Sequence, residues 1–400
     1  MPMPPANIPI SVHGRYLWRG DRRFCVRGVV YQDHAASGPR DLISDESVAQ
    51  LRHDITLFKE LGLNTIYVYF IDNEKPHDQA MKLLEDAGIY VYASLTTPQR
   101  CINRMSPDRS YKPELMRSVF NTIDLMAKYT NTLGVEIANC LFNQHSDLDS
   151  IAPVLKIVVC DVKMYMDIKH QLAGQRALLI SYSGNSNEVR DDLLLEYLSS
   201  GHSMERIDLW TCTRYSWQSK DHAELMRRFE RTKAPVFFSE YSSGTQGRRT
   251  FEETSALYFG RMNKIFSGGC AYEFSQGANG YGLIQMLRST NFESTLAFEE
   301  AVKKIDESRR ASQKVETDHG LLVKFRDFDS YKASLAAVED VYAEEKEADK
   351  SEDTVNICSW EPRSGLPGTC VDWERLAEEI MLELETGQRK SGRTQWGYHV

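Results

Sequence analysis

The sequence lacks several features that would point to common classes of function. No window holds the roughly 18 uninterrupted apolar residues that a transmembrane helix needs, and no run of Lys and Arg is interleaved with aromatic residues. The net charge of −9, from 57 acidic and 48 basic residues, also argues against nucleic acid and anionic membranes as partners. A Gly-rich phosphate loop is absent as well, so the sequence does not favour a nucleotide.

Targeting signals are missing too. The N-terminal residues MPMPPANIPI carry no basic segment followed by an apolar one, as a secretory signal peptide would. The C-terminal residues RKSGRTQWGYHV lack the hydrophobic tail of a lipid-anchor signal, and the chain has no Asn-x-Ser/Thr sequon. From the sequence as given we expect a cytoplasmic protein without a membrane-spanning segment.

The cysteines do not form a metal-binding pattern. None belongs to a CxxC pair, and their spacings do not match a zinc site, so we expect neither a metal nor a cofactor. Several lie in apolar, strand-like runs, where a free thiol behaves as a small hydrophobe. Whether Cys358 pairs with Cys370 stays open at this point. The eight cysteines are Cys25, Cys101, Cys140, Cys160, Cys212, Cys270, Cys358 and Cys370.

Eight short apolar runs recur along the chain, and each of the first seven is followed by a helical pattern. Alternating strands and helices indicate a parallel sheet, and eight such units in roughly 250 residues predict an α/β fold, the (β/α)8 TIM barrel. The runs are Phe24–Gln32, Thr65–Ile71, Ile89–Leu95, Leu133–Cys140, Ala177–Tyr182, Ile207–Tyr215, Val236–Glu240 and Gly269–Phe274.

The remaining chain divides into three parts. Residues 287–320 are charged and helical in tendency, and we interpret them as a solvated insertion. Residues 321–337 are expected to pack back as a last strand and helix, so that the barrel domain covers residues 15–337. Residues 338–355 are acidic and predict a linker or disorder. Residues 356–400 are expected to form a C-terminal appendage with a short amphipathic helix.

Polar and aromatic side chains close several of the predicted strands, and the carboxyl ends of barrel strands share one face. Glu240 ends an apolar strand, where a carboxylate is costly to bury unless it is paired or used. It could be paired with an arginine, or it could act as a nucleophile or base. Asn139 and Cys140 end another strand. Tyrosines and amides end most of the others, and such a surface suits a carbohydrate better than a nucleotide.

Several segments of the chain form a set in a fixed order. They are VRGVVYQ at Val26–Gln32, FKELGLNTIYVY at Phe58–Tyr69, HDQAMKLLEDAGIYV at His77–Val91, TNTLG at Thr130–Gly134, APVFFSEY at Ala234–Tyr241, SGG at Ser267–Gly269 and YGLI at Tyr281–Ile284. Together they resemble glycoside hydrolase family 72, the fungal β-1,3-glucanosyltransferases that elongate cell-wall glucan. The resemblance covers residues 15–285 and implies a retaining enzyme that acts on β-1,3-glucan, with Glu240 as the nucleophile.

Retaining chemistry needs two carboxyl groups about 5–5.5 Å apart, one as nucleophile and one as acid and then base. In the family the second is the Glu of a Gly-Asn-Glu sequence that closes strand four. This chain has Ala138-Asn139-Cys140 there, so Cys140 stands at the acid/base position. Glu136 lies about 13 Å before Cys140 along an extended strand and should point toward the closed end of the barrel, which makes it a poor substitute. Losing an acid/base group removes about 10²–10⁴-fold in rate.

The resemblance also implies roles for the other residues at the strand ends. Asn139 would hydrogen-bond the sugar 2-hydroxyl and Tyr215 would orient Glu240. The residues expected to contact sugars are Gln32, Tyr69, Tyr272 and Tyr281. Two hypotheses follow: retaining transglycosylation through Glu240 that Cys140 impairs, or a catalytically inactive pseudoenzyme that binds glucan or regulates. Family disulfide cysteines are replaced here by Gln218 and Ser243, which fits a reducing compartment.

Overall fold

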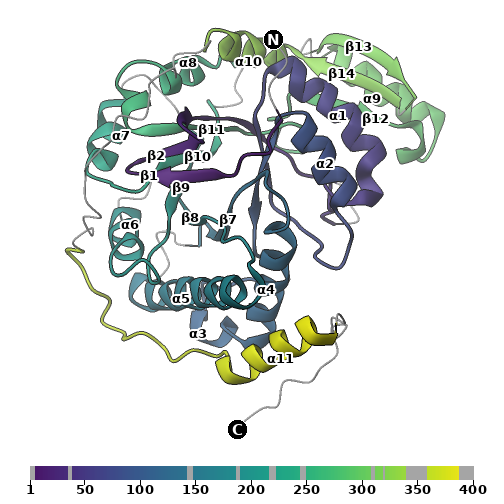
Figure 1. Ribbon diagram of the computed structural model, residues 1–400. Coiled ribbons are helices and arrows are strands. Elements are labelled where there is room, and N and C mark those ends of the chain that lie inside the picture. Colours follow the sequence, from purple (N-terminus) through teal and green to yellow (C-terminus); the bar gives the residue numbers. More distant parts are fainter. Residues whose placement is uncertain are drawn as a thin grey trace.

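The structure is a computed structural model that describes residues 5–34, 38–141, 147–185, 190–215, 222–243, 249–307, 311–318, 320–338 and 358–386. Its centre is a closed barrel of parallel strands in the order β10-β11-β4-β5-β6-β7-β8-β9 (Figure 1). The predicted (β/α)8 barrel is therefore confirmed. The barrel strands are β4 (Val26–Val30), β5 (Thr65–Val68), β6 (Tyr90–Ser94), β7 (Thr132–Asn139), β8 (Ile180–Asn185), β9 (Leu209–Arg214), β10 (Val236–Tyr241) and β11 (Phe266–Ala271).

Helices surround the barrel because the longer ones place an apolar stripe against the outward faces of the strands. On α1, for example, Leu51, Ile55 and Phe58 are buried at helical spacing, and Gly62 ends the helix in the left-handed conformation at φ 75°. The helices are α1 (Val48–Leu61), α2 (Asp78–Asp86), α3 (Pro107–Ser110), α4 (Pro113–Met126), α5 (Leu148–Ala173), α6 (Asp191–Ser199), α7 (His222–Phe229) and α8 (Glu252–Tyr258). Short 3-10 turns lie at Asp45–Ser47, Met262–Lys264 and Ser289–Asn291.

A small antiparallel sheet covers the amino end of the barrel. It has the order β1-β2-β3 and consists of β1 (Ile10–His13), β2 (Tyr16–Arg19) and β3 (Arg22–Phe24). Ile10, Leu17 and Phe24 join the side chains that fill the barrel interior, among them Tyr90 and Phe237. The sequence did not predict this sheet. Because the sheet covers the amino end, a site inside the barrel can open only at the carboxyl end.

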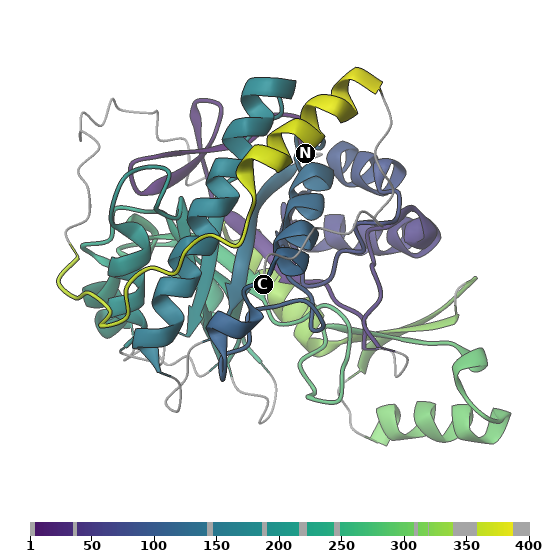
Figure 2. The ribbon, with the colours of Figure 1, turned by 90° about the horizontal axis from the view of Figure 1, so that it is seen from below.

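A second antiparallel sheet follows the barrel. It has the order β12-β14-β13, from β12 (Ile284–Leu287), β13 (Ala311–Thr317) and β14 (Gly320–Phe325), and it projects to one side together with α9 (Thr295–Glu307) (Figure 2). The charged segment 287–320 thus contains α9 and the mostly exposed β13. The chain then returns through α10 (Arg326–Ala336), where the buried Tyr331 hydroxyl donates to Gly28 O at 2.6 Å.

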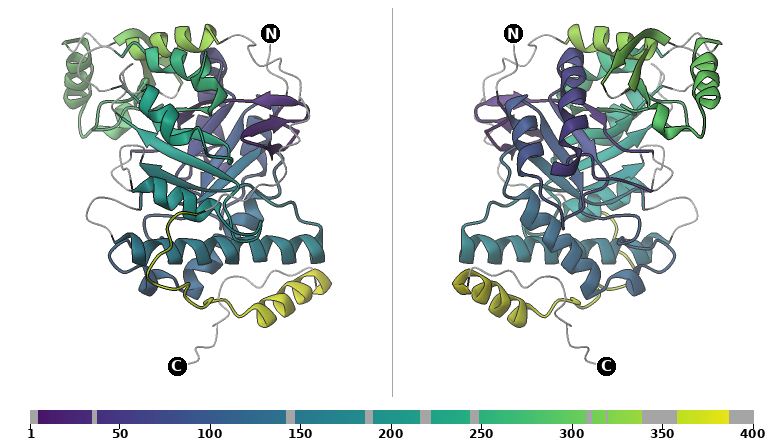
Figure 3. Two further views of the ribbon diagram at one scale, coloured as in Figure 1. Left: turned by 90° about the vertical axis from the view of Figure 1, so that its left-hand side faces the viewer. Right: turned by 90° about the vertical axis from the view of Figure 1, so that its right-hand side faces the viewer.

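The last described segment lies along α5. Residues 358–372 lead to α11 (Trp373–Thr386), which runs beside α5 in both views of Figure 3. Thr369 Oγ1 donates to Asp161 Oδ1 at 2.9 Å, and Leu376 and Ile380 enter the main core. Almost all of the acidic linker expected at residues 338–355 lies outside the described residues, as do residues 387–400. Among the helices that the structure describes, none combines the length and apolarity needed to cross a bilayer.

Candidate active site

A β-bulge precedes each of the two site residues that the sequence singled out. On β7, Glu136 aligns with Ser181 of β8 and Asn139 with Ser183, so three steps on β7 match two on β8. Residues three apart on a regular strand point to opposite faces, and the extra residue cancels that alternation. Glu136 and Asn139 therefore both point into the barrel, where both contact the Tyr67 hydroxyl.

A β-bulge on β10 orients Glu240 in the same way. Phe238 aligns with Cys212 of β9, and Glu240 aligns with Thr213, so two steps on β10 match one on β9. Phe237 already fills the barrel interior, and the bulge turns Glu240, three residues later, to the same side. The carboxyl ends of β7 and β10 thereby bring Asn139 and Glu240 together.

The Glu240 carboxyl is buried, with 6% of the residue exposed, and is held by neutral donors. Asn139 Nδ2 donates to Oε1 at 3.0 Å, and the Tyr215 hydroxyl donates to Oε2. Tyr69 hydrogen-bonds the same carboxyl. Burial raises the pKa of Glu240, the three hydrogen bonds lower it, and the charge of Glu273 raises it, with a raised pKa as the result. Among the described residues, Glu240 makes no ion pair with an arginine.

Cys140 follows Asn139 in the left-handed conformation, at φ 45°. Its Sγ lies 3.4 Å from Thr213 Oγ1 and 3.8 Å from Gly184 O. Burial raises the pKa of the thiol strongly, the Glu240 carboxylate raises it further, and the Thr213 hydrogen bond lowers it only in part. The thiol therefore stays protonated near neutral pH, and it is too weak an acid to resemble a carboxylic acid at this position.

Three tyrosines form a wall beside Glu240. The ring centroids of Tyr215, Tyr272 and Tyr281 lie 5.2 to 5.8 Å apart in edge-to-face contacts. Gln32 Nε2 donates to the Tyr272 hydroxyl at 3.1 Å. Across the site, Tyr69 packs against Tyr67 with centroids 4.5 Å apart. The structure thus gathers the residues predicted as sugar contacts at one end of the barrel, together with Glu240.

Arg249 anchors this tyrosine wall, and sequence reasoning missed it. The residue is 2% exposed, and its guanidinium donates to Tyr272 O at 2.7 Å and Tyr281 O at 2.5 Å. Its Nε pairs with Asp327 Oδ2 of α10 at 2.8 Å. Arg249 follows Arg248 in a polar stretch of sequence and Asp327 is distant along the chain, so no sequence signal marks the pair.

Glu273 is a third carboxyl group at this end of the barrel. It is fully buried, its Oε2 accepts from Gln32 Nε2, and His34 Nε2 lies 2.7 Å from the same oxygen. Its Oε1 has no hydrogen-bond partner in the described part of the chain. A glutamate at the end of the eighth apolar run was visible in the sequence and could have been singled out by the reasoning applied to Glu240.

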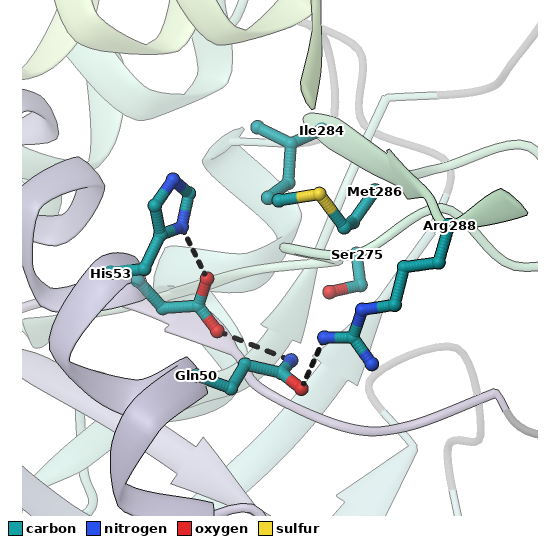
Figure 4. A pocket seen from close by; sticks show the side chains of 7 residues that line it. Gln50, His53, Ser275, Ile284, Met286 and Arg288 are labelled. Carbon is teal, nitrogen blue, oxygen red and sulfur yellow. Dashed lines mark hydrogen bonds and ion pairs between the residues drawn. The ribbon is translucent and has the colours of Figure 1, made fainter. Parts of the chain in front are cut away.

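A small pocket outside the barrel lies between α1 and β12 and contains none of the predicted site residues (Figure 4). Its polar groups satisfy one another: Arg288 Nη2 donates to Gln50 Oε1 at 3.1 Å, and Asp54 accepts from Gln50 and from Tyr31. Within the described ranges, no group of three or more His, Cys, Asp or Glu side chains is arranged to hold a metal ion.

Comparisons with known proteins give a consistent result. The glucanosyltransferase family model, glycoside hydrolase family 72, matches residues 4–308. The 1,3-β-glucanosyltransferase gel1 of Aspergillus fumigatus is 36% identical over 284 residues, which cover 70% of this chain and 61% of the relative. The 1,3-β-glucanosyltransferase GAS5 of Saccharomyces cerevisiae is 34% identical over 288 residues, which cover 70% of this chain and 58% of the relative.

A solved structure extends the similarity to three dimensions. A glutamate-to-glutamine mutant of Saccharomyces cerevisiae Gas2p, in complex with laminaritetraose and laminaripentaose, superimposes with a TM-score of 0.71 at 26% identity. The match covers 86% of this chain and 70% of that one. The chain spans about 60% of the length of the curated relatives, at 61% and 58% for the two above. These fungal relatives give no support to the cytoplasmic location expected from the sequence.

Proposed function

The chain belongs to the glucanosyltransferase family, glycoside hydrolase family 72, and from this premise we propose that it binds β-1,3-glucan oligosaccharides at the tyrosine wall and uses Glu240 as a nucleophile. The observation that carries the proposal is the setting of Glu240. Its two carboxyl oxygens are engaged by Asn139 and Tyr215 beside an aromatic surface. Relatives of this family have been solved with laminari-oligosaccharides, which are the ligands proposed here.

The proposed reaction has two steps. A Glu240 oxygen attacks the anomeric carbon as the glycosidic C–O bond breaks, and the leaving oxygen takes a proton, which gives a glycosyl-enzyme. In the second step a hydroxyl of an acceptor glucan attacks the same carbon, loses its proton and releases the Glu240 carboxylate. The donors around Glu240 favour the ionised carboxylate that the first step needs, and they oppose the effect of burial on its pKa.

Cys140 limits both proton transfers in this scheme. Its pKa is raised by burial and by the Glu240 charge, so the thiol neither releases a proton as readily as a carboxylic acid nor becomes a base near neutral pH. We therefore propose that transfer from natural glucan is slow. A donor with a good leaving group, such as laminaribiosyl fluoride, needs no proton in the first step and should react much faster.

Chain-length redistribution tests the proposal. Reduced laminari-oligosaccharides are incubated with wild type, with Cys140→Glu and with Glu240→Gln, and products are followed by mass spectrometry. Cys140→Glu should raise elongation by about 10²–10⁴-fold, because the neighbours that raise the thiol pKa would keep a carboxyl group there protonated as an acid. Cys160→Glu on α5 is the matched control and should change nothing. The proposal would be overturned if neither wild type nor Cys140→Glu formed elongated products and neither bound the oligosaccharide.

A second candidate is a glucan-binding pseudoenzyme. The neutral thiol at Cys140 favours it, because the residue at the acid/base position is poorly suited to acid/base chemistry near neutral pH. This candidate predicts that wild type binds laminarihexaose in calorimetry yet forms no product from either natural glucan or laminaribiosyl fluoride. Covalent modification of Glu240 by the fluoride would exclude it.

The cellular location remains a separate prediction. A cytoplasmic location was expected from the sequence as given, and fractionation of cells that produce the native protein would test it. Recovery with cell-wall material would refute that expectation without changing the proposed chemistry at Glu240.

A further inference from the structure

We infer that Glu136 and Tyr67 are positioning residues that fix the orientation of Asn139 and, through it, of Glu240. The inference rests on the proposed function, because Glu240 is taken as the nucleophile. It concerns two residues below the site, neither of which contacts a sugar in the proposed scheme. From the sequence Glu136 was expected to point toward the closed end of the barrel, and its connection to Glu240 was not foreseen. The structure connects the two through only two side chains, Tyr67 and Asn139.

The connection is a one-way series of hydrogen bonds. Asn139 Nδ2 donates one hydrogen to Glu240 Oε1 and the other to the Tyr67 hydroxyl oxygen, each at 3.0 Å. The Tyr67 hydroxyl has a single hydrogen, which it donates to Glu136 Oε1. Because that hydrogen is committed to Glu136, only lone pairs of Tyr67 face Asn139. The amide nitrogen, rather than the amide oxygen, must therefore face both Tyr67 and Glu240.

Removing the acceptor at Glu136 would release this constraint. The Tyr67 hydroxyl could then turn its hydrogen toward Asn139 and bond the amide oxygen instead. A flipped amide would place Asn139 Oδ1 against Glu240 Oε1, and two acceptors would face each other. Glu240 would lose a donor that stabilises its ionised form, although no residue in contact with it had changed.

The surroundings of Glu136 favour a dedicated role over an incidental one. The residue is fully buried in the barrel, where a carboxyl group is costly unless it is hydrogen-bonded. The groups that face it are Tyr67 of β5, Tyr92 and Ser94 of β6, and the more distant Glu240 of β10. The Tyr92 hydroxyl, in turn, contacts Ser181 at 2.6 Å and Thr211 at 3.1 Å. All of these side chains are neutral except Glu240.

The protonation state of Glu136 agrees with this role. Burial raises its pKa to about 8, and the Glu240 charge adds to the effect, while hydrogen bonds from Tyr67 and Tyr92 act in the opposite direction. Glu136 is therefore mostly neutral near pH 7. A neutral carboxyl group with its proton on Oε2 still accepts from Tyr67 through Oε1, while its O–H faces the Tyr92 hydroxyl 3.3 Å away. It adds no second negative charge near the nucleophile.

Two substitutions separate the acceptor from the charge. Glu136→Gln keeps an oxygen that accepts from Tyr67, whereas Glu136→Leu removes it, and Tyr67→Phe breaks the series one step closer to Asn139. Tyr31→Phe is the matched control, since it also removes a buried tyrosine hydroxyl, but one that bonds Asp54 outside the barrel interior. Each variant is first shown to unfold cooperatively.

The first readout needs no substrate. The side-chain carboxyl carbon of isotope-labelled Glu240 is titrated by NMR and assigned with Glu240→Gln. Tyr67→Phe and Glu136→Leu should raise the pKa of Glu240 by about 1 unit, the size expected for one lost hydrogen bond to a carboxylate. Glu136→Gln and Tyr31→Phe should titrate like wild type. Equal titration of Glu240 in wild type, Tyr67→Phe and Glu136→Leu would overturn the inference.

The second readout measures the nucleophile itself. A 2-deoxy-2-fluoro-laminaribiosyl fluoride modifies Glu240 without help from Cys140, and intact mass reports the rate. Tyr67→Phe and Glu136→Leu should slow labelling at least tenfold, with binding of laminarihexaose little changed and with Glu136→Gln close to wild type. Labelling of wild type together with unchanged labelling in both disruptive variants would refute the inference. Wild type that neither binds nor labels would instead refute the proposed function, and the titration would still decide the inference.

Discussion

Replacing Arg249 by methionine should weaken both the fold and the tyrosine wall. Arg249 and Asp327 are 2% and 5% exposed, and their 2.8 Å ion pair joins the loop after β10 to α10. Removing one member of a buried ion pair typically costs about 3–5 kcal/mol, because the other charge stays buried. The carbonyl groups of Tyr272 and Tyr281 lose a charged donor as well. We expect a loss of about 4 kcal/mol in the free energy of unfolding, since such contributions are not additive.

A double-mutant cycle in urea measures this quantity. Arg249→Met, Asp327→Leu and the double variant are unfolded at equilibrium and followed by tryptophan fluorescence, with attention to the slope as well as the midpoint. The double variant should recover at least about 1 kcal/mol relative to the sum of the single changes, because no lone charge remains buried. Arg363→Met is the control: its side chain is 93% exposed and lies 3.8 Å from Asp149. That change should stay within about 0.5 kcal/mol.

Two results would contradict the reasoning. A loss below about 1 kcal/mol in Arg249→Met would mean that the ion pair and the two carbonyl contacts contribute little. Strict additivity in the cycle would mean that Arg249 and Asp327 do not interact in solution. A third measurement connects the pair to the site: laminarihexaose affinity should fall in Arg249→Met even when the variant is fully folded, because the wall tyrosines lose their anchor.

Three further predictions use the same approach. Tyr272→Ala should weaken laminarihexaose binding about tenfold in calorimetry, through loss of an aromatic contact, and unchanged affinity would remove Tyr272 from the binding surface. Glu136 has a pKa of about 8 against 4.5 for an ordinary glutamate, so the unfolded chain ionises first and stability should fall as pH rises between these values, by up to about 1.4 kcal/mol per unit. Urea unfolding of Glu136→Gln should show a smaller fall. Burial lowers the pKa of His77, but the hydrogen bond and charge of Asp41 raise it by more, so the folded pKa is above the ordinary value. This pair therefore stabilises the fold at low pH, and its contribution to the free energy of unfolding is lost as pH rises through the folded pKa. His77→Asn should remove this pH dependence in urea unfolding.

The sequence was sufficient for the barrel because its signals are local. Each barrel strand overlaps a short apolar run of the sequence and is buried over most of its length, so each run predicted a strand that the structure contains. The β1-β2-β3 sheet was not predicted because its strands of three or four residues mix polar or charged side chains with apolar ones. An alternating pattern of three or four residues is too short to be distinguished from the sequence of a loop.

The candidate site was predictable in its residue types but not in its connections. Glu240, Asn139 and the tyrosines were identified from their positions at strand ends, and their proposed roles remain predictions. The connection of Glu136 to Asn139 was not predicted, because a bulge between these two residues leaves no mark in the residue types. The Arg249–Asp327 pair depends on a tertiary contact between distant segments, which one sequence does not reveal.

The two bulges also lie between the strand positions that fill the barrel interior and the strand ends that carry Asn139 and Glu240. On β7 and β10 one extra residue shifts the alternation of inward-facing and outward-facing side chains between the middle of the strand and its carboxyl end. The phase of the alternation changes by one residue at each bulge, and for this reason Asn139 and Glu240 face the inside of the barrel. Deleting one residue at Ile137 or Ala138 would remove the bulge and leave Glu136 and Asn139 two residues apart on a regular strand, where both would still point into the barrel. A barrel built this way can carry a different side chain at the end of a strand, such as the thiol of Cys140, while its architecture stays the same.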